Sequence, residues 1–312
     1  MKLRRYIEFF IMTCGLFCLA PSMPRAEQFE PPAYVESILH DGEGIPLSFP
    51  SFVFCDHNKN ELYVIDSRDR VVIYAADLFP LAALTSKDGI EAPQGLAVDG
   101  NGNVYVSMSA SRSNPRNRIS VFNASLKWDH DIYFSGFDGA DAFSPYHLAA
   151  DRQGKIYVTG YYKEVVLVID SKGQLLHLIS PEEEGKKVNI NSVTVDKTGR
   201  IYLVSAEAGR VFVYDSNRKF LFKFGVKGGT SAHLSIAGAA GVDDRNGRIY
   251  VLDTMRNSVN VYDRDGGYIS EFGGLGWQEG WFQQPKHITV DSRGRIMVAD
   301  TFNNRVQVFQ AK

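Results

Sequence analysis

The chain has 312 residues, a formal charge of −2 and three cysteines, of which only Cys55 lies beyond the first 26 residues. The weakly acidic balance argues against a nucleic-acid partner, because binding to phosphates needs a basic surface that releases counterions. One remaining cysteine excludes an intramolecular disulfide, and its apolar surroundings predict a buried, small hydrophobic side chain.

The first 26 residues have the form of a secretory signal. Lys2, Arg4 and Arg5 precede an apolar run at residues 7–20, and small residues follow as far as Ala26. We expect cleavage near Ala26 and a location in the periplasm or outside the cell, with no transmembrane span in the mature chain. Retention as an anchor is the alternative, which the short apolar run disfavours. Cleavage moves the formal charge from −2 to −5, since it removes four basic residues and one acidic residue.

From residue 27 onward the chain repeats one pattern six times. Each copy carries an aromatic or methionine anchor, at intervals of 42 to 52 residues: Tyr63, Tyr105, Tyr157, Tyr202, Tyr250 and Met297. A copy contains four short segments, three of them clear runs of period-two apolar alternation, separated by turns rich in Gly, Asp and Asn. Four strands in a unit of this length predict the blades of a propeller.

The last copy stops after its third strand, at Phe309 and Gln310, and the segment 34–44 resembles the fourth strand and exit loop of the other copies. We predict that residues 34–44 complete the sixth blade, which hides two sheet edges. The expected fold is an all-β, six-bladed propeller of four-stranded antiparallel blades, in which residues 27–312 form a single domain.

The stretch PKHITVDSRGRIMVADTFNNRVQVF, from Pro285 to Phe309, resembles an NHL repeat, and the resemblance extends with decay over residues 34–310. It implies an exported bacterial protein of the NHL type. NHL-like propellers include protein-binding and RNA-binding modules, and related six-bladed folds include lyases and lactonases. The resemblance therefore specifies the fold more closely than the activity.

By this resemblance, the residue two positions after the start of each first strand points toward the channel mouth. These positions hold Phe52, Gly95, His147, Ser192, approximately Ala240, and His287. Glycine is common there in the family, so His147 and His287, on opposite blades, are departures, and His233 is expected on the same face. One interpretation is a metal or acid–base site at these three histidines, with zinc or calcium as the ion. The other is that they line a polar, water-filled channel and bond neighbouring loops.

The loops on this face carry further candidates. Blade 3 offers Tyr161 and Tyr162, the loop after blade 5 offers Trp277, and an insertion in blade 2 carries Arg112 and Arg116. Exposed aromatic and arginine side chains are typical of interface hot spots. Other loop residues have simpler interpretations: Phe282 is expected to pack under the next blade, and Asp138 and Asp141 are a weak calcium pattern.

Acidic residues recur after the second strand of several blades. Asp66 and Asp300 are followed four or five residues later by Arg70 and Arg305, and Asp253 is followed by Ser258. A ring of functional carboxylates is one interpretation. We favour a structural one, in which Asp caps the loop and pairs with Arg on the next strand.

The sequence contains no P-loop, GxSxG or HExxH motif, and no catalytic constellation fixed by spacing. We expect a binding scaffold without a cofactor rather than an enzyme. Its loop face would recognise a protein, peptide or glycan, such as another cell-envelope or secreted protein. The alternative is a metal-dependent lyase or hydrolase that uses His147, His233 and His287.

Overall fold

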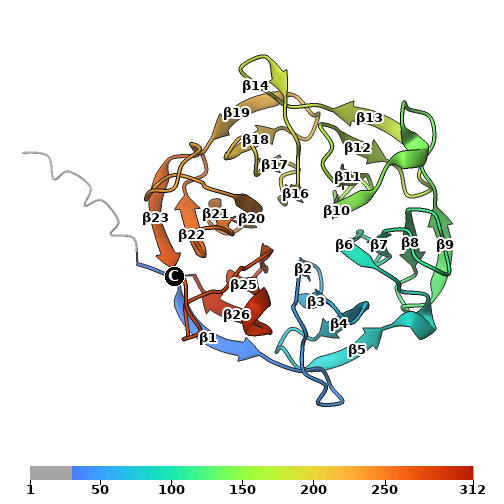
Figure 1. Ribbon diagram of the computed structural model, residues 1–312, viewed down its shortest axis with the longest axis horizontal. Helices are drawn as coiled ribbons and strands as arrows, with labels where there is room; N and C mark the ends of the chain where they lie inside the picture. The colour runs from blue at the N-terminus through green and yellow to red at the C-terminus, as the bar shows by residue number, and fades with distance from the viewer. Residues whose placement is uncertain (1–29, 312) are drawn as a thin grey trace, which may run out of the picture. The chain divides into compact units, whose positions relative to one another are not determined.

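The computed structural model describes residues 30–311, and in this part of the chain six four-stranded antiparallel sheets stand around a central axis (Figure 1). The chain is thus an all-β, six-bladed propeller, as the repeats predict. Within residues 30–311, no helix has the length and hydropathy of a membrane span. The predicted signal at residues 1–26 lies outside the described residues.

The blades follow each other in chain order, and each runs from the axis outward. Blade 1 is β2 (Phe52–Asp56), β3 (Glu61–Asp66), β4 (Arg70–Tyr74) and β5 (Pro80–Leu84). Blade 2 is β6 (Pro93–Val98), β7 (Val104–Met108), β8 (Arg118–Phe122) and β9 (Trp128–Ile132). Blade 3 is β10 (Pro145–Ala150), β11 (Ile156–Gly160), β12 (Val166–Ile169) and β13 (Leu175–Ile179).

The second half of the ring repeats this order. Blade 4 is β16 (Ser192–Val195), β17 (Ile201–Ser205), β18 (Arg210–Tyr214) and β19 (Phe220–Phe224). Blade 5 is β20 (Ala237–Asp243), β21 (Arg248–Asp253), β22 (Ser258–Tyr262) and β23 (Tyr268–Gly273). Blade 6 is β24 (Ile288–Val290), β25 (Arg295–Asp300), β26 (Arg305–Gln310) and β1 (Ala33–Ile38). A short ribbon of β14 (Glu182–Glu183) and β15 (Lys186–Lys187) lies between blades 3 and 4.

The N-terminal strand closes the ring. β1 pairs antiparallel with β26, so that Tyr34 lies opposite Phe309 and Ile38 opposite Val306. The predicted closure is confirmed, although the strand ends at Ile38 and residues 39–44 turn back toward blade 1. This pairing covers the outer edge of β26, and β1 becomes the outermost strand of blade 6.

The repeating tyrosines have a structural role. Tyr105, Tyr157 and Tyr202 lie on the second strands, and each hydroxyl donates to an aspartate at the end of the first strand of its own blade, over 3.1 to 3.2 Å. The other oxygen of each aspartate accepts two backbone N–H groups of the turn, as at Asp99. Each pair therefore closes a turn and fixes two strands at once.

The apolar core lies between the blades. Val53, Val64 and Val72 of blade 1 pack with Met297 and Val306 of blade 6, and the same layering recurs around the ring. Alternate side chains of each strand point to opposite faces of its sheet, so every blade contributes to two neighbouring layers. Cys55 belongs to the layer between blades 6 and 1 and is 1% exposed, as predicted.

The structural interpretation of the acidic residues after the second strands is confirmed. Arg70 pairs with Asp66 over 2.9 Å, and Arg305 pairs with Asp300 over 2.7 Å. Asp253, which lacks an arginine partner at position 258, accepts the backbone N–H groups of the loop, among them that of Met255 over 3.2 Å. These carboxylates are engaged in holding the fold.

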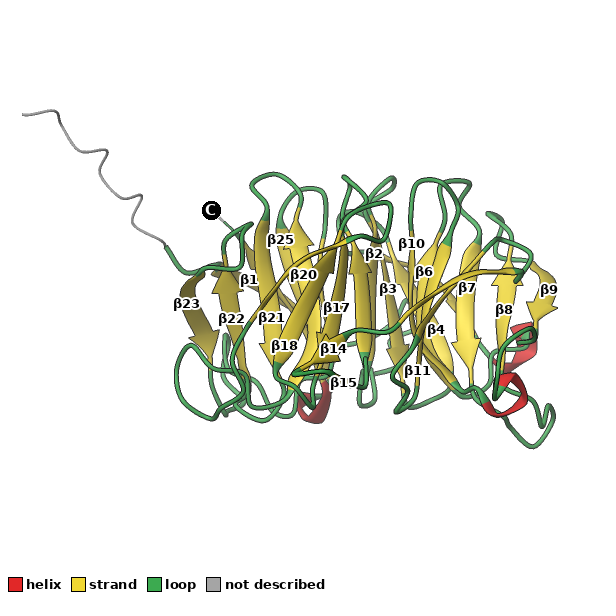
Figure 2. Ribbon diagram, turned by 90° about the horizontal axis from the view of Figure 1, so that it is seen from above, coloured by secondary structure: helices red, strands yellow, loops and turns green. Residues whose placement is uncertain are grey.

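The ring has two distinct faces (Figure 2). The loop face carries the connections between blades and those between second and third strands, including the short helices η1 (Ser86–Asp88), η2 (Ala140–Ala142) and η3 (Thr301–Asn303). The turn face carries the tight turns between first and second strands and between third and fourth strands. Because the strands are antiparallel, every first strand begins at the loop face and ends at the turn face.

Candidate functional site

The six first strands bring one equivalent residue each to the axis near the loop face. Strand register identifies these as Phe52, Gly95, His147, Ser192, Ala239 and His287. Ala239 replaces the expected Ala240 because β20 has a bulge between Ala237 and Ala240. Three positions hold a ring and three hold a small residue, so the rings have room to meet at the axis.

The contact between the rings closes the channel. The ring centroids of His147 and His287 are 4.7 Å apart with an interplanar angle of 89°, and Phe52 lies 5.0 Å from His147 and 4.1 Å from His287. We call these three residues the ring plug. The two histidines are 4% and 6% exposed, so most of each side chain is buried in the plug.

Glycine at position 95 makes the plug possible. A Cβ atom on Gly95 would lie 2.7 Å from the backbone oxygen of Tyr146 and 3.0 Å from Cα of His147. Any side chain there would displace the strand that carries His147. Gly95 of blade 2 is thus required for His147 of blade 3 to pack at the axis.

Both plug histidines are held neutral. Nδ1 of His287 lies 2.9 Å from the carbonyl oxygen of Val53, and because a carbonyl only accepts, Nδ1 carries the proton. Burial lowers the pKa of His287 to about 3, and burial together with the neighbouring His287 lowers the pKa of His147 well below its usual range. Within residues 30–311, Nδ1 of His147 has no hydrogen-bond partner.

A chain of aromatic contacts leads from the plug to the surface of the loop face. Tyr146 stacks on His147 with centroids 4.0 Å apart, Tyr161 meets Tyr146 at 5.6 Å, and Tyr162 meets Tyr161 at 4.5 Å. We call Tyr146, Tyr161 and Tyr162 the aromatic run. Tyr161 is 53% exposed and Tyr162 is 75% exposed, so the run ends in solvent.

The sequence identified the two ends of this chain of contacts and missed its middle. Tyr146 is only partly buried and bridges His147 to Tyr161. The signal was its place directly before His147 at the start of a first strand, where a β-bulge turns it away from the regular alternation.

The remaining loop candidates lie on the same face at other blades. Trp277, in the connection from blade 5 to blade 6, is 78% exposed. Arg112 and Arg116 lie in the connection between β7 and β8, and the guanidinium of Arg116 sits 4.0 Å over the ring of Tyr133. Phe282 is fully buried against other rings, as predicted.

The third expected metal ligand lies apart from the other two. Nδ1 of His233 is 3.0 Å from Thr230 Oγ1 and from the Ser231 carbonyl oxygen, in the connection from blade 4 to blade 5. From residue 30 to residue 311, no three His, Cys, Asp or Glu side chains are grouped so that they could hold a metal ion. Asp138 and Asp141, the weak calcium pattern, are exposed in the connection from blade 2 to blade 3.

On the other side of the plug, the axis holds a cavity of about 280 Å³. Its lining includes residues of the first strand of every blade, from Phe52 and His287 at the plug to Arg152 and Lys197 at the turn face. Since the plug closes one end and exposed turn residues form the other, the cavity opens on the turn face. We call it the axial cavity. Sequence reasoning placed all its candidates on the loop face and missed it.

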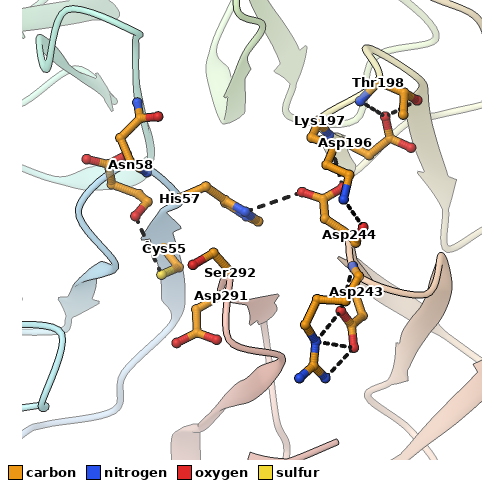
Figure 3. A network of polar contacts seen from close by, with 12 residues as sticks. Cys55, His57, Asn58, Asp196, Lys197, Thr198, Asp243, Asp244, Asp291 and Ser292 are labelled. Atoms are coloured by element: carbon orange, nitrogen blue, oxygen red, sulfur yellow. Dashed lines mark hydrogen bonds and ion pairs between the residues drawn. The ribbon is translucent and has the colours of Figure 1, made fainter.

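Ion pairs and hydrogen bonds join different blades at the mouth of this cavity (Figure 3). Nδ1 of His57, in blade 1, lies 3.3 Å from a carboxylate oxygen of Asp244, in blade 5. The backbone N–H of Lys197, in blade 4, donates to the other oxygen of Asp244 over 3.0 Å, and the Lys197 ammonium donates to its carbonyl. The mouth is therefore bridged across blade 6 by polar contacts.

Comparison with known proteins agrees with the propeller fold. A family described as "DUF5128: 6-bladed beta-propeller" matches residues 229–312. No curated protein matches the chain. The solved structure of a streptogramin B lyase is similar, with a TM-score of 0.61 at 12% identity, covering 89% of this chain and 98% of the lyase.

Two proteins from Bacteroides thetaiotaomicron are also similar in structure. One, of unknown function, has a TM-score of 0.66 at 13% identity, covering 90% of this chain and 73% of its own. The other, an auxiliary nutrient binding protein, has a TM-score of 0.64 at 11% identity, covering 89% and 75%. At these identities the similarities establish that the chain is a six-bladed β-propeller.

Proposed function

We propose that this protein is an exported binding scaffold that recognises a protein, peptide or glycan through its loop face. The observation that carries the proposal is the aromatic run, which extends from the buried plug to the exposed rings of Tyr161 and Tyr162. Aromatic side chains supply large contact area at low conformational cost, and tyrosine adds a hydroxyl for polar contacts. Rings anchored on a buried plug are held in place before a partner arrives.

Other features of the loop face support a binding role. Trp277, between blades 5 and 6, offers a second exposed aromatic anchor, and the exposed Arg112 of blade 2 offers a charged contact. The auxiliary nutrient binding protein shows that a propeller of similar architecture serves a binding role elsewhere. We infer that the repeats are of the NHL type, on the strength of the motifs between Pro285 and Phe309.

Photo-crosslinking from the loop face tests this proposal. A photoreactive phenylalanine at Tyr162 or Trp277 is expected to capture a defined partner in the native host, most directly another cell-envelope or secreted protein. The matched control is the same residue at Trp128, which is 58% exposed on an outer strand. With the photoreactive phenylalanine placed at a different residue of the loop face, Tyr162→Ala and Trp277→Ala should abolish capture of the partner. Trp128→Ala should leave that capture unchanged. Equal capture from all three aromatic positions would argue against a loop-face site.

Export is a separate part of the proposal. It rests on the signal-like segment at residues 1–26. N-terminal sequencing of the protein from the periplasm or the medium should find Glu27 as the first residue. Full-length protein recovered with the membrane would indicate a retained anchor instead.

A metal-dependent lyase or hydrolase is the second candidate. The observation in its favour is that the two predicted histidines do meet, and that a nitrogen of His147 lacks a partner among residues 30–311. The similar lyase structure adds only a likeness of fold. Elemental analysis of protein purified without chelator tests it: about one zinc or calcium per chain, lost in the His147→Ala and His287→Ala double variant, would favour the enzyme over the scaffold.

A further inference from the structure

Four exposed aromatic side chains gather on the loop face where blades 5, 6 and 1 follow each other around the ring (Figure 1). Trp277 and Trp281 lie in the connection from blade 5 to blade 6, Phe302 lies in η3 of blade 6, and Phe49 lies in the connection that leads into blade 1. We call these four residues the aromatic patch. Each is about half exposed or more, so together they present on the order of 400 Å² of apolar surface. An apolar patch of this size on a monomer often has a binding role.

Hydrogen bonds and a ring contact hold the members of the patch beside one another. The backbone N–H of Phe302 donates to the carbonyl oxygen of Gln283 over 3.0 Å, and the Asn303 carboxamide donates to the carbonyl oxygen of Gly276 over 2.9 Å. Both acceptors belong to the connection that carries the two tryptophans. On the other side, the rings of Phe302 and Phe49 meet with centroids 5.8 Å apart. The four side chains therefore belong to one packed region of the loop face.

The connection that carries the tryptophans is held against β26. The Arg305 guanidinium donates to the carbonyl oxygens of Gln278 and Trp281 over 2.8 and 3.0 Å. The Gln307 carboxamide accepts the Gly280 N–H over 2.9 Å and donates to the Trp281 carbonyl oxygen over 2.7 Å. A loop that is held at three residues near its tip loses little freedom on binding, so its exposed rings are pre-organised for a ligand.

Two members of the patch are kept in place by unusual backbone. The indole of Trp281 packs on its own loop, where a Cβ atom on Gly274 would lie 2.8 Å from the six-membered ring. Phe49 has a φ of 44°, in the left-handed region that a bulky residue rarely adopts, and its N–H donates to Asn304 Oδ1 over 2.9 Å. Strain of this kind clusters at functional positions, and here it presents a ring to solvent.

The free polar groups beside the patch are mostly uncharged. Gln278 and Gln283 are exposed, and within residues 30–311 their hydrogen bonds use backbone groups only, which leaves both carboxamides free. Residues 274–284 contain one charged side chain, that of Glu279. The Arg305 guanidinium is already paired with Asp300 over 2.7 Å. A carboxamide both donates and accepts, so it matches a hydroxyl group better than an ion.

We propose that the aromatic patch binds a neutral oligosaccharide, with sugar rings against the two tryptophans and hydroxyl groups bonded to Gln278 and Gln283. The C–H groups of a sugar ring carry partial positive charge and pack on the negative face of an aromatic ring. Its hydroxyl groups donate and accept, as the free carboxamides do. A protein partner of standard size needs about 800 Å² on each side, roughly twice the area of the patch. The assignment rests on the proposed function, because it names the ligand class for part of the same loop face.

Intrinsic fluorescence tests this proposal directly, because the three tryptophans of the chain are Trp128, Trp277 and Trp281. Replacing Trp128, which is exposed on an outer strand, with phenylalanine leaves tryptophan only in the patch. The probes are cellohexaose, maltohexaose, xylohexaose and mannohexaose. We expect at least one of them to shift the emission of the Trp128→Phe variant in a saturable way. Calorimetric titration of the wild type with the same oligosaccharide should give the same Kd.

Substitutions then separate the two kinds of contact. Trp277→Ala and Trp281→Ala should each weaken binding of that oligosaccharide at least tenfold. The Gln278→Leu and Gln283→Leu double variant keeps the apolar area, and it should also weaken binding at least tenfold because the hydroxyl groups lose their partners. Tyr162→Ala, on blade 3 outside the patch, is the matched control and should leave binding unchanged. The thermal midpoint of each variant checks that it folds.

The outcomes separate this site from alternatives. Failure of all four oligosaccharides to bind would overturn the proposal, and so would binding that survives both tryptophan substitutions. Binding that the double glutamine variant leaves unchanged would mark a purely apolar site and refute the glycan assignment. Capture of a protein from position 277 without any oligosaccharide binding would refute the glycan and leave the loop-face proposal standing. Absence of both would contradict both proposals.

Discussion

Replacing His147 with phenylalanine should reduce the sensitivity of this protein to acid. Both histidines of the ring plug are buried, and burial holds their pKa values below the 6.5 of an exposed imidazole, at about 3 for His287. Below pH 6.5 the unfolded chain takes up a proton at each position, whereas the folded chain stays neutral down to the lower pKa. The free energy of unfolding therefore falls as the pH falls through this window, and it is unaffected by these groups above pH 6.5.

The size of the effect follows from the linkage. At about pH 4.5, two units below the unfolded pKa, His287 alone lowers the free energy of unfolding by roughly 3 kcal/mol, and His147 adds to it in the same direction. His147→Phe removes one titrating group, so the slope of the free energy of unfolding against pH should become shallower below about pH 6.5, by roughly 1 kcal/mol per pH unit. Phenylalanine can keep the stack on Tyr146, and no partner of Nδ1 among residues 30–311 is lost.

Urea denaturation at a series of pH values between about 4.5 and 7.5 measures this slope for the wild type and the variant. His177→Gln is the matched control, because His177 is exposed on the outer strand β13. Its slope should match that of the wild type. If the stability of His147→Phe also declines toward acid as steeply as that of the wild type, then His147 is not held neutral in the fold and the account of the plug is wrong.

Two further substitutions and one labelling experiment test the packing. Gly95→Ala should lower the free energy of unfolding by about 1–3 kcal/mol, because its Cβ would press on the Tyr146 backbone oxygen, while Gly100→Ala, with open space around it, should change it by less than about 0.5 kcal/mol in the same denaturation assay. Arg70→Met should lower the thermal midpoint and cost about 3–5 kcal/mol, because it leaves two buried carboxylates without their cation; wild-type stability would show that they find other partners. Cys55 should react with Ellman's reagent only after unfolding, because burial raises the pKa of its thiol, and labelling of the native protein would contradict that burial.

The fold could be predicted because each blade repeats the same local chemistry. Strand alternation and turn residues recur in six copies and the tyrosine anchor in five, so a copy that is hard to interpret by itself can be aligned with the others. Ring closure could be predicted because the last copy lacks a fourth strand and residues 34–44 resemble one. The structure shows why the anchors recur: a tyrosine such as Tyr157 bonds the aspartate that ends the first strand. This hydrogen bond joins two residues six apart in the chain. The sequence alone showed that the tyrosines recur but not what they bind.

The site was harder to predict because it depends on which blades face each other and how far side chains reach. The sequence placed His147 and His287 at equivalent positions, but it could not show that Gly95, Ser192 and Ala239 leave the space in which those rings meet. It also gave no sign of the axial cavity, because that cavity is walled by backbone and by residues separated along the whole chain.

The ring plug gives the two faces of the propeller a common boundary. Phe52 and His287 form the floor of the axial cavity, and through His147 the same rings support the aromatic run of the loop face. A ligand that reaches the floor and a partner that engages Tyr161 would thus contact opposite ends of one packed set of rings. Close packing transmits a displacement of any ring to its neighbours, so the His147→Phe variant belongs in the loop-face crosslinking experiment. Unchanged capture of the partner by that variant would show that the plug is a passive closure.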